Sequence, residues 1–141
     1  QRERLELVLS ASPICFNHNL ETVKRLQREV RRGATYEHSL NLLKSAREIA
    51  PHIPTKSGIM LGLGEQFHEI IQTLKDLREV DCQYLTIGQY LRPSLAHIPV
   101  SHYWSPEKFN DFAKIAKDIG FKKVNSGPLV RSSYHANESF E

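Results

Sequence analysis

The segment Ser57-Gly58-Ile59-Met60-Leu61-Gly62-Leu63-Gly64-Glu65 begins the pattern that decides the fold. It is short, apolar and rich in glycine, which is typical of a buried strand whose end lies close to a bulky group. The apolar spacing then becomes helical, at Phe67, Ile70, Ile71, Leu74 and Leu77. A second short strand is predicted at residues 84–88. A strand, a helix and a strand in this order predict a βαβ unit with parallel strands.

The same alternation extends in both directions from this unit. Upstream, we expect a short strand within residues 7–16, a helix over 22–32 and a second helix over 36–50. Downstream, Ser105-Pro106-Glu107 predicts a helix start, since it offers an N-cap, a first-turn proline and a favourable carboxylate. A strand at 121–124 follows. The sequence therefore predicts an α/β fold with a parallel sheet.

Length and composition limit this fold to part of a larger one. A closed eight-fold barrel needs at least about 200 residues, and the chain has 141 residues, of which 40% are hydrophobic and 25% charged. We therefore expect the second half of a larger sheet, and the absence of an initial Met suggests that the natural protein extends upstream. The net charge of +3 is too small to indicate a nucleic-acid partner. No window reaches the roughly 18–20 apolar residues of a membrane span, so we expect a soluble intracellular protein.

Several common chemistries lack their motifs. The seven histidines are dispersed without the His-x-x-x-His spacing of a zinc protease, and no Gly-x-Ser-x-Gly motif of a serine hydrolase is present. Cys15 and Cys82 are 67 positions apart, and two reduced, separate thiols are the simplest interpretation.

Ligands of parallel α/β proteins bind beyond the carboxyl ends of the strands, where three segments stand out. Residues 17–21 (Asn-His-Asn-Leu-Glu) offer amide and carboxylate groups for a ribose or an amino acid, although a helix-capping turn also explains them. Gly58, Gly62 and Gly64 would let an adenine or a phosphate approach the backbone, or would simply form a tight turn. Residues 89–93 (Gln-Tyr-Leu-Arg-Pro) form the third segment, whose alternative is a buried tyrosine.

Four blocks, taken together, resemble the lipoyl synthases. These blocks are residues 17–23 (NHNLETV), 55–65 (TKSGIMLGLGE), 85–91 (LTIGQYL) and 126–134 (SGPLVRSSY). Their order and spacing agree with that family over essentially the whole chain. The resemblance implies a radical S-adenosylmethionine enzyme with a partial (β/α) barrel, of which this chain is the C-terminal half with a C-terminal extension. The implied division is a core part at 1–124 and an extension at 125–141.

The resemblance also implies residue roles. S-adenosylmethionine would be bound at the strand ends, with Asn19 and Glu21 on the ribose, Asn17 supporting them, and Lys56 near the methionine carboxylate. The full set of implied binding residues is Asn17, Asn19, Glu21, Lys56, Gly62, Gly64, Glu65, Gln89, Tyr90 and Leu91. Ser133, with Ser132 as the fallback, would bind one iron of the auxiliary [4Fe-4S] cluster that donates sulfur, because a hard alkoxide suits an iron that is released.

One departure from the family is large. The two cysteine triplets that hold its two [4Fe-4S] clusters have no counterpart, since Cys15 and Cys82 cannot form either. We therefore expect this chain to be catalytically silent alone and to lack any catalytic residue of its own.

For the complete protein, the resemblance implies a sulfurtransferase that inserts two sulfur atoms into an octanoyl chain on a carrier protein. A 5′-deoxyadenosyl radical would abstract hydrogen from an unactivated methylene. Implied partners are octanoylated lipoyl domains, the glycine cleavage H protein and a reductant such as ferredoxin or flavodoxin, with no nucleic acid or membrane. The implied location is the cytoplasm, or an organellar matrix in a eukaryote.

Two alternatives stay open at this stage. One is another sulfur-inserting radical enzyme such as a biotin synthase, which shares an Asn-His-Asn-Leu type of strand end. Residues 131–134 (Arg-Ser-Ser-Tyr) argue against it. The other is a non-catalytic remnant that binds an acidic lipoyl carrier domain through Arg28, Arg31 and Arg32, although such a basic side is usually only solvated.

Overall fold

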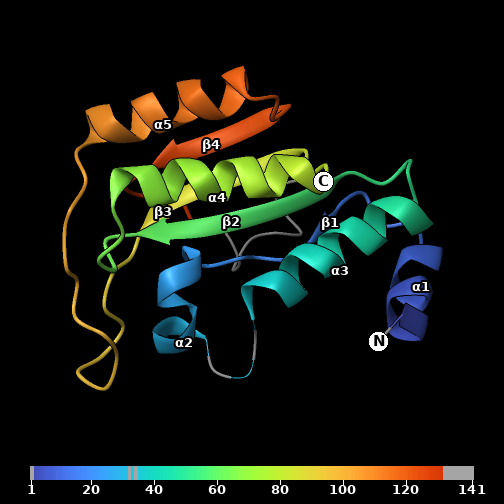
Figure 1. Cartoon of the computed structure of the whole chain (residues 1–141), viewed down its shortest axis with the longest axis horizontal. Coiled ribbons are helices and arrows are strands. Elements are labelled where there is room, and N and C mark those ends of the chain that lie inside the picture. The colour runs from blue at the N-terminus through green and yellow to red at the C-terminus, as the bar shows by residue number, and fades with distance from the viewer. Residues whose placement is uncertain (1, 32, 34, 132–141) are drawn as a thin grey trace.

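Four parallel strands form one sheet in the computed structural model, which describes residues 2–31, 33 and 35–131. The strands are β1 (Phe16–Asn17), β2 (Thr55–Leu61), β3 (Tyr84–Gln89) and β4 (Lys123–Gly127). Their order in the sheet is their order in the sequence, so each new strand adds to the same edge (Figure 1). The prediction of a parallel α/β sheet is confirmed.

Three long helices lie along one face of this sheet, namely α3 (Tyr36–Ile49), α4 (Phe67–Glu79) and α5 (Pro106–Asp118) (Figure 1). The predicted starts of α4 and α5 are found, and local bonds explain them. Gln66 and Glu69 form a reciprocal capping box at α4, and the Ser105 hydroxyl accepts the Lys108 backbone N–H at α5.

The main core fills the space between these helices and the sheet. Ile59 of β2 and Ile87 of β3 are fully buried there, together with Phe109 and Phe112 of α5. Because side chains alternate along a strand, the residues on either side of Ile59 and Ile87 point to the opposite face of the sheet, which we call the inner face. That inner face carries the registered rows Lys56–Tyr84–Lys123, Gly58–Thr86–Asn125 and Met60–Gly88–Gly127.

The prediction of a strand within residues 7–16 is wrong for most of its length. Residues Arg2–Ser10 form helix α1, and only Phe16–Asn17 pair as a strand. Leu5 and Leu9 are one helical turn apart and bury themselves in a second small core formed with Ala46, Ala50 and Ile53. Packing against α3 therefore decides the conformation of this segment.

The predicted helix at 22–32 is also shorter than expected. A 3-10 turn, η1 (Lys24–Leu26), leads into the four-residue helix α2 (Gln27–Val30). The reason is a buried glutamine: the Gln27 amide donates to the carbonyl oxygens of Leu20 (2.9 Å) and Thr22 (2.7 Å). These bonds hold the turn against the preceding segment.

The last predicted strand is found further along the chain than expected. A strand is predicted at 121–124, and the observed strand β4 covers Lys123–Gly127. The reason is that Phe121 belongs to the core at the end of α5, where its N–H donates to the Ala116 carbonyl.

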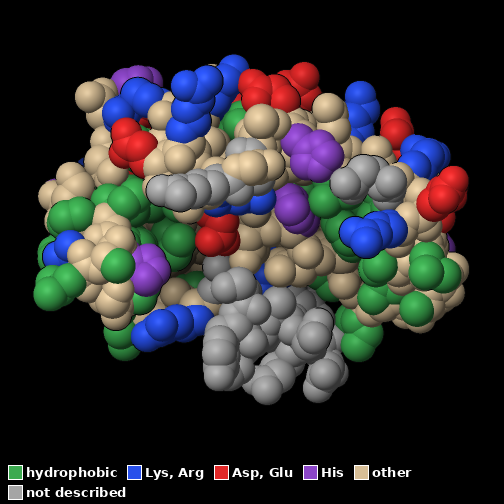
Figure 2. Space-filling view, turned by 90° about the horizontal axis from the view of Figure 1, so that it is seen from below, with side chains coloured by type: hydrophobic (Ala, Val, Ile, Leu, Met, Phe, Trp, Pro, Cys, Tyr) green, Lys and Arg blue, Asp and Glu red, His purple; other side chains and the backbone are tan. Residues whose placement is uncertain are grey.

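The surface carries two groups of exposed apolar side chains. In Figure 2 they gather at opposite ends of the molecule, over α1 and over the loop that follows β3. Leu7 and Val8 contribute to the first, and Leu91 and Leu95 to the second, with Leu95 87% exposed. Among the described helices, none has the length and apolar character that crossing a bilayer requires.

Candidate functional site

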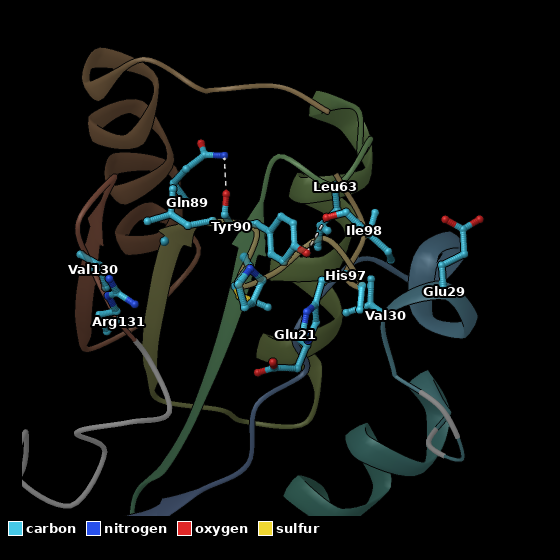
Figure 3. Close-up of a pocket in the computed structure, with 15 residues that line it drawn as sticks. Glu21, Glu29, Val30, Leu63, Gln89, Tyr90, His97, Ile98, Val130 and Arg131 are labelled. Carbon is cyan, nitrogen blue, oxygen red and sulfur yellow. Dashed lines mark hydrogen bonds between the residues drawn. The ribbon is translucent and has the colours of Figure 1, made fainter. Parts of the chain in front are cut away.

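A cavity of about 640 Å³ lies at the carboxyl ends of β2 and β3. Figure 3 shows that its walls come from segments 21–30, 88–98 and 130–131 and from Leu63, most of which are far apart in the sequence. Met60 and Gly88 contribute from the inner face of the sheet. Four of the ten predicted binding residues line this cavity, namely Glu21, Gln89, Tyr90 and Leu91.

Glu21 extends the β1 side of the sheet toward this cavity. Its N–H donates to the Gly58 carbonyl (2.9 Å), and its own carbonyl accepts the Met60 N–H (2.8 Å). Its φ of 73° lies in the left-handed region, which is uncommon for a residue with a side chain. Burial raises the pKa of the Glu21 carboxyl, while Arg31 and a hydrogen bond from Asn19 act in the opposite direction. The backbone is thus fixed in a costly conformation that presents a partly desolvated carboxyl group.

Asn17 and Asn19 stand beside Glu21 on the same side of the chain. Asn17 and Asn19 are two apart and share a face, the Asn19 side chain forms a hydrogen bond with the Glu21 carboxyl, and Leu20 between Asn19 and Glu21 is buried in the core on the helical side. The Oδ1 atoms of Asn17 and Asn19 are buried and have no hydrogen-bond partner within the described ranges. Buried polar atoms are normally satisfied, so these two amide oxygens beside Glu21 indicate a ligand site. Of this row of Asn17, Asn19 and Glu21, only Glu21 lines the cavity.

The glycine segment after β2 is used by the protein itself. A Cβ at Gly62 would overlap Gln89 Nε2 and would lie 2.5 Å from the His102 carbonyl oxygen, and the φ of +104° independently requires glycine. The Ser101 N–H donates to the Gly62 carbonyl at 2.7 Å. Gly64 also has a positive φ, with only Ser101 nearby. These glycines allow the loop after β3 to pack on the turn after β2, and neither lines the cavity.

Glu65 holds the same junction together. Its carboxylate accepts the backbone N–H groups of Gly62 (2.8 Å) and Leu63 (3.0 Å), and also the Trp104 indole N–H (2.7 Å). With a side chain that is 7% exposed, Glu65 acts on the turn and the loop. A role in ligand binding stays a prediction.

Gln89 and Tyr90 organise the loop that forms one wall. Gln89 donates to the His102 carbonyl (3.0 Å) and accepts the Trp104 N–H (3.1 Å). The Tyr90 hydroxyl donates to the Ile98 carbonyl (2.6 Å), as the buried-tyrosine alternative expects. Leu91 beside them is 45% exposed.

Lys56 lies away from the main cavity, at the start of β2. Its backbone is in register with Asn17, and its side chain lines a second cavity of about 310 Å³. Burial lowers the pKa of the Lys56 ammonium. Other cations line this cavity too, namely Lys117, Lys122, Lys123 and Arg131. The structure therefore separates Lys56 from the Glu21 cavity, and its contact with a methionine carboxylate stays a prediction.

The remaining predicted residues are the two cysteines and the serines expected to bind iron. Cys15 and Cys82 are both free thiols, and burial raises the pKa of Cys15 to about 11 and that of Cys82 to about 12. Within residues 2–31, 33 and 35–131, no three His, Cys, Asp or Glu side chains are grouped to hold a metal ion. Ser132 and Ser133 lie outside the described residues.

The basic side proposed for carrier binding is partly occupied internally. Arg31 donates to the Leu20 carbonyl (3.1 Å) and to the Ser39 hydroxyl (3.1 Å). Arg28 is exposed, and Arg32 lies outside the described residues. Arg31 therefore fixes the backbone of Leu20, which lies between Asn19 and Glu21.

Sequence reasoning missed most of the apolar wall and its last segment. The missed lining residues are Val30, Met60, Leu63, Pro93, Ala96, Ile98 and Val130. For Val130 a local signal exists, since the turn at Ser126-Gly127-Pro128 sends the chain back toward the sheet. Met60, Leu63 and Pro93 belong to segments 57–65 and 89–93, which the sequence indicated without naming these side chains. Val30, Ala96 and Ile98 reach the cavity only through tertiary packing.

The sequence is similar to a known protein superfamily and to several curated proteins. The Radical SAM superfamily profile matches residues 1–77. Lipoyl synthase 2 of one Prochlorococcus marinus strain is 74% identical over 136 residues, which are 96% of this chain and 44% of that protein. Lipoyl synthase 2 of Thermosynechococcus vestitus is 62% identical over 138 residues (98% and 48%). Lipoyl synthase of Thioalkalivibrio sulfidiphilus is 52% identical over 141 residues (97% and 44%). The chain spans less than half the length of these curated relatives.

Proposed function

The chain belongs to the radical SAM superfamily, and we propose that it is the C-terminal part of a lipoyl synthase, which inserts two sulfur atoms into a protein-bound octanoyl chain. The observation that carries this proposal is the 74% identity to a lipoyl synthase 2 over 96% of this chain. The matched share of that relative is 44%, so the activity belongs to a longer protein and we expect this chain alone to be inactive.

The residues at the strand ends fit S-adenosylmethionine. Its ribose hydroxyls and adenine amino group are hydrogen-bond donors, and the buried Oδ1 atoms of Asn17 and Asn19 are acceptors without a partner among the described residues. The Glu21 carboxyl is a further acceptor in the same row.

S-adenosylmethionine held at these strand ends would supply the 5′-deoxyadenosyl radical that abstracts hydrogen. This chain's own contribution is to orient and to exclude water. Asn19 and Glu21 would fix the ribose, because two directional bonds on one sugar leave little freedom of rotation. The apolar wall formed by Met60, Leu63 and Ile98 would keep water from the reactive carbon.

Two cluster assignments complete the proposal. The cysteines of both [4Fe-4S] clusters would come from the part of the protein upstream of this chain. Ser133, or Ser132 as the fallback, would bind an iron of the auxiliary cluster. Arg131, which directly precedes Ser132 in the sequence, lines the cavity. Because β4 continues to Gly127, the C-terminal extension that we propose for 125–141 takes its first three residues from the sheet.

The proposed partners follow from the reaction. They are octanoylated lipoyl domains or the glycine cleavage H protein as substrates, and ferredoxin or flavodoxin as the reductant. We propose the cytoplasm, or an organellar matrix, as the compartment.

The test is a reconstituted reaction with the complete protein. An octanoyl-lysyl peptide, S-adenosylmethionine and dithionite should give a peptide that has gained two sulfur atoms, by mass spectrometry. Dethiobiotin in a parallel reaction tests the biotin synthase alternative, and its conversion in place of the peptide would refute the proposal.

A pair of glutamate variants tests the site. We expect Glu21→Gln to weaken S-adenosylmethionine binding by on the order of 10-fold, because a hydrogen bond to a charged group contributes about 1.5–3 kcal/mol. Glu29→Gln is the matched control, since Glu29 lines the same cavity but its carboxylate points away from Glu21 in Figure 3. Equal binding by both variants would remove Glu21 from the site.

A further inference from the structure

The end of β3 is crossed closely by the chain that follows β4. A Cβ on Gly88 would overlap the Val130 carbonyl oxygen and would lie 3.3 Å from the Val130 carbonyl carbon. Gly88 has no positive φ, so its backbone suits any residue, and only the space for a side chain is missing. The requirement for glycine at this position is therefore steric.

The approach follows from the turn at the end of β4. The Val130 N–H donates to the Gly127 carbonyl at 3.2 Å, which turns the chain back across the sheet. Gly127 is in register with Gly88 on the inner face. We call residues 128–131 the crossing segment. Its contact with β3 is made by backbone atoms, which cannot rotate aside as a side chain does.

The crossing segment is also a wall of the main cavity. Val130 and Arg131 line it beside Gly88 and Gln89, and Figure 3 shows Val130 and Arg131 together at one side of it, next to the strand end that carries Gln89. Arg131 is followed directly by Ser132 and Ser133 in the sequence. A shift of Val130 thus moves the cavity wall.

We propose that Gly88 is a positioning residue: its missing side chain seats the crossing segment on β3 and so sets where Val130 and Arg131 stand in the cavity wall. This inference rests on the proposed function for its effect on sulfur insertion. The seating itself does not depend on that function.

The expected displacement sets the size of the effect. Ordinary Cβ contacts begin at 3.4 Å, so a methyl group at Gly88 requires the Val130 carbonyl to retreat by about 1 Å. A misplacement of about 1 Å costs on the order of 10²-fold in rate when it affects reacting groups. Gly127→Ala is a matched control, because its Cβ would meet only the Val130 Cγ2 atom, at 3.5 Å.

The experiment compares Gly88→Ala and Gly127→Ala in the complete protein. Hydrogen–deuterium exchange reports on the crossing segment, and 5′-deoxyadenosine and lipoyl products report on the two halves of the reaction. We expect faster exchange at the Val130 amide in Gly88→Ala only. We also expect 5′-deoxyadenosine and lipoyl formation to fall together on the order of 10²-fold, because Val130 and Arg131 line the cavity proposed for S-adenosylmethionine. Exchange and product formation equal to those of the unchanged protein would overturn the proposal.

A double variant covers the case in which Gly88→Ala does not fold. Glycine at position 130 gives the backbone freedom to move its carbonyl away, so Gly88→Ala with Val130→Gly should recover soluble protein. No recovery would assign the conflict to another contact and overturn the proposal. If the unchanged protein forms no lipoyl product, the proposed function fails, and the exchange comparison still decides the seating of the crossing segment.

Discussion

Replacement of Glu65 by alanine separates a structural role from a binding role at this position. The Glu65 carboxylate accepts three N–H groups, from Gly62, Leu63 and the Trp104 indole, at 2.7–3.0 Å. These bonds join the turn after β2 to the loop after β3. Removal of the carboxylate leaves the two backbone donors buried without an acceptor.

The expected loss of stability is about 3 kcal/mol. A buried donor left unsatisfied costs about 1–3 kcal/mol, and two such donors remain after the change. The indole of Trp104 is only partly buried and can turn to water, so it adds little. Glu65→Gln should cost less, because one oxygen remains to accept, although its amide then faces a donor.

Urea unfolding of the chain, followed by fluorescence, measures this loss. Trp104 is the single tryptophan, and it lies at the perturbed junction. Glu79→Ala is the control, because Glu79 is exposed at the end of α4 and surface changes stay within about 0.5 kcal/mol. A loss below about 1 kcal/mol for Glu65→Ala would refute the structural role. Weaker S-adenosylmethionine binding by Glu65→Gln at unchanged stability would indicate the binding role instead.

Two further predictions concern local interactions. Arg25 lowers the pKa of Glu69 to about 2. The Glu69 carboxylate therefore stabilises the fold above its unfolded pKa of about 4.5, and this stabilisation is lost as the pH falls toward 2. The urea midpoint of the unchanged chain should fall more steeply between pH 5 and 2 than that of Arg25→Ala, and equal slopes would contradict this. Ser105→Ala should lower stability by about 1 kcal/mol because it removes the cap of α5. Ser101→Ala at an exposed loop position is the control, and equal urea midpoints for the two variants would argue against the cap.

Local sequence signals were sufficient for the helices and strands in the middle of the chain. The apolar spacing from Phe67 to Leu77 and the cap at Ser105 depend on neighbouring residues only, and both helices are found. The same reasoning failed at residues 7–16, where Leu5 and Leu9 form a helix because α3 offers them an apolar surface. That surface is more than 30 residues away in the sequence.

The candidate site also divides into features that the local sequence predicts and features that tertiary packing decides. The sequence alone predicted a polar strand end at Asn17, Asn19 and Glu21, because these residues follow an apolar run, and their role in binding stays a prediction. Only the tertiary structure decided their partners: Glu65 and Gln89 are bonded within the protein, while the Oδ1 atoms of Asn17 and Asn19 are buried with no partner in the described part of the chain. The physical reason is that hydrogen-bond partners and excluded volume, such as the Val130 carbonyl over Gly88, come from segments distant in the sequence.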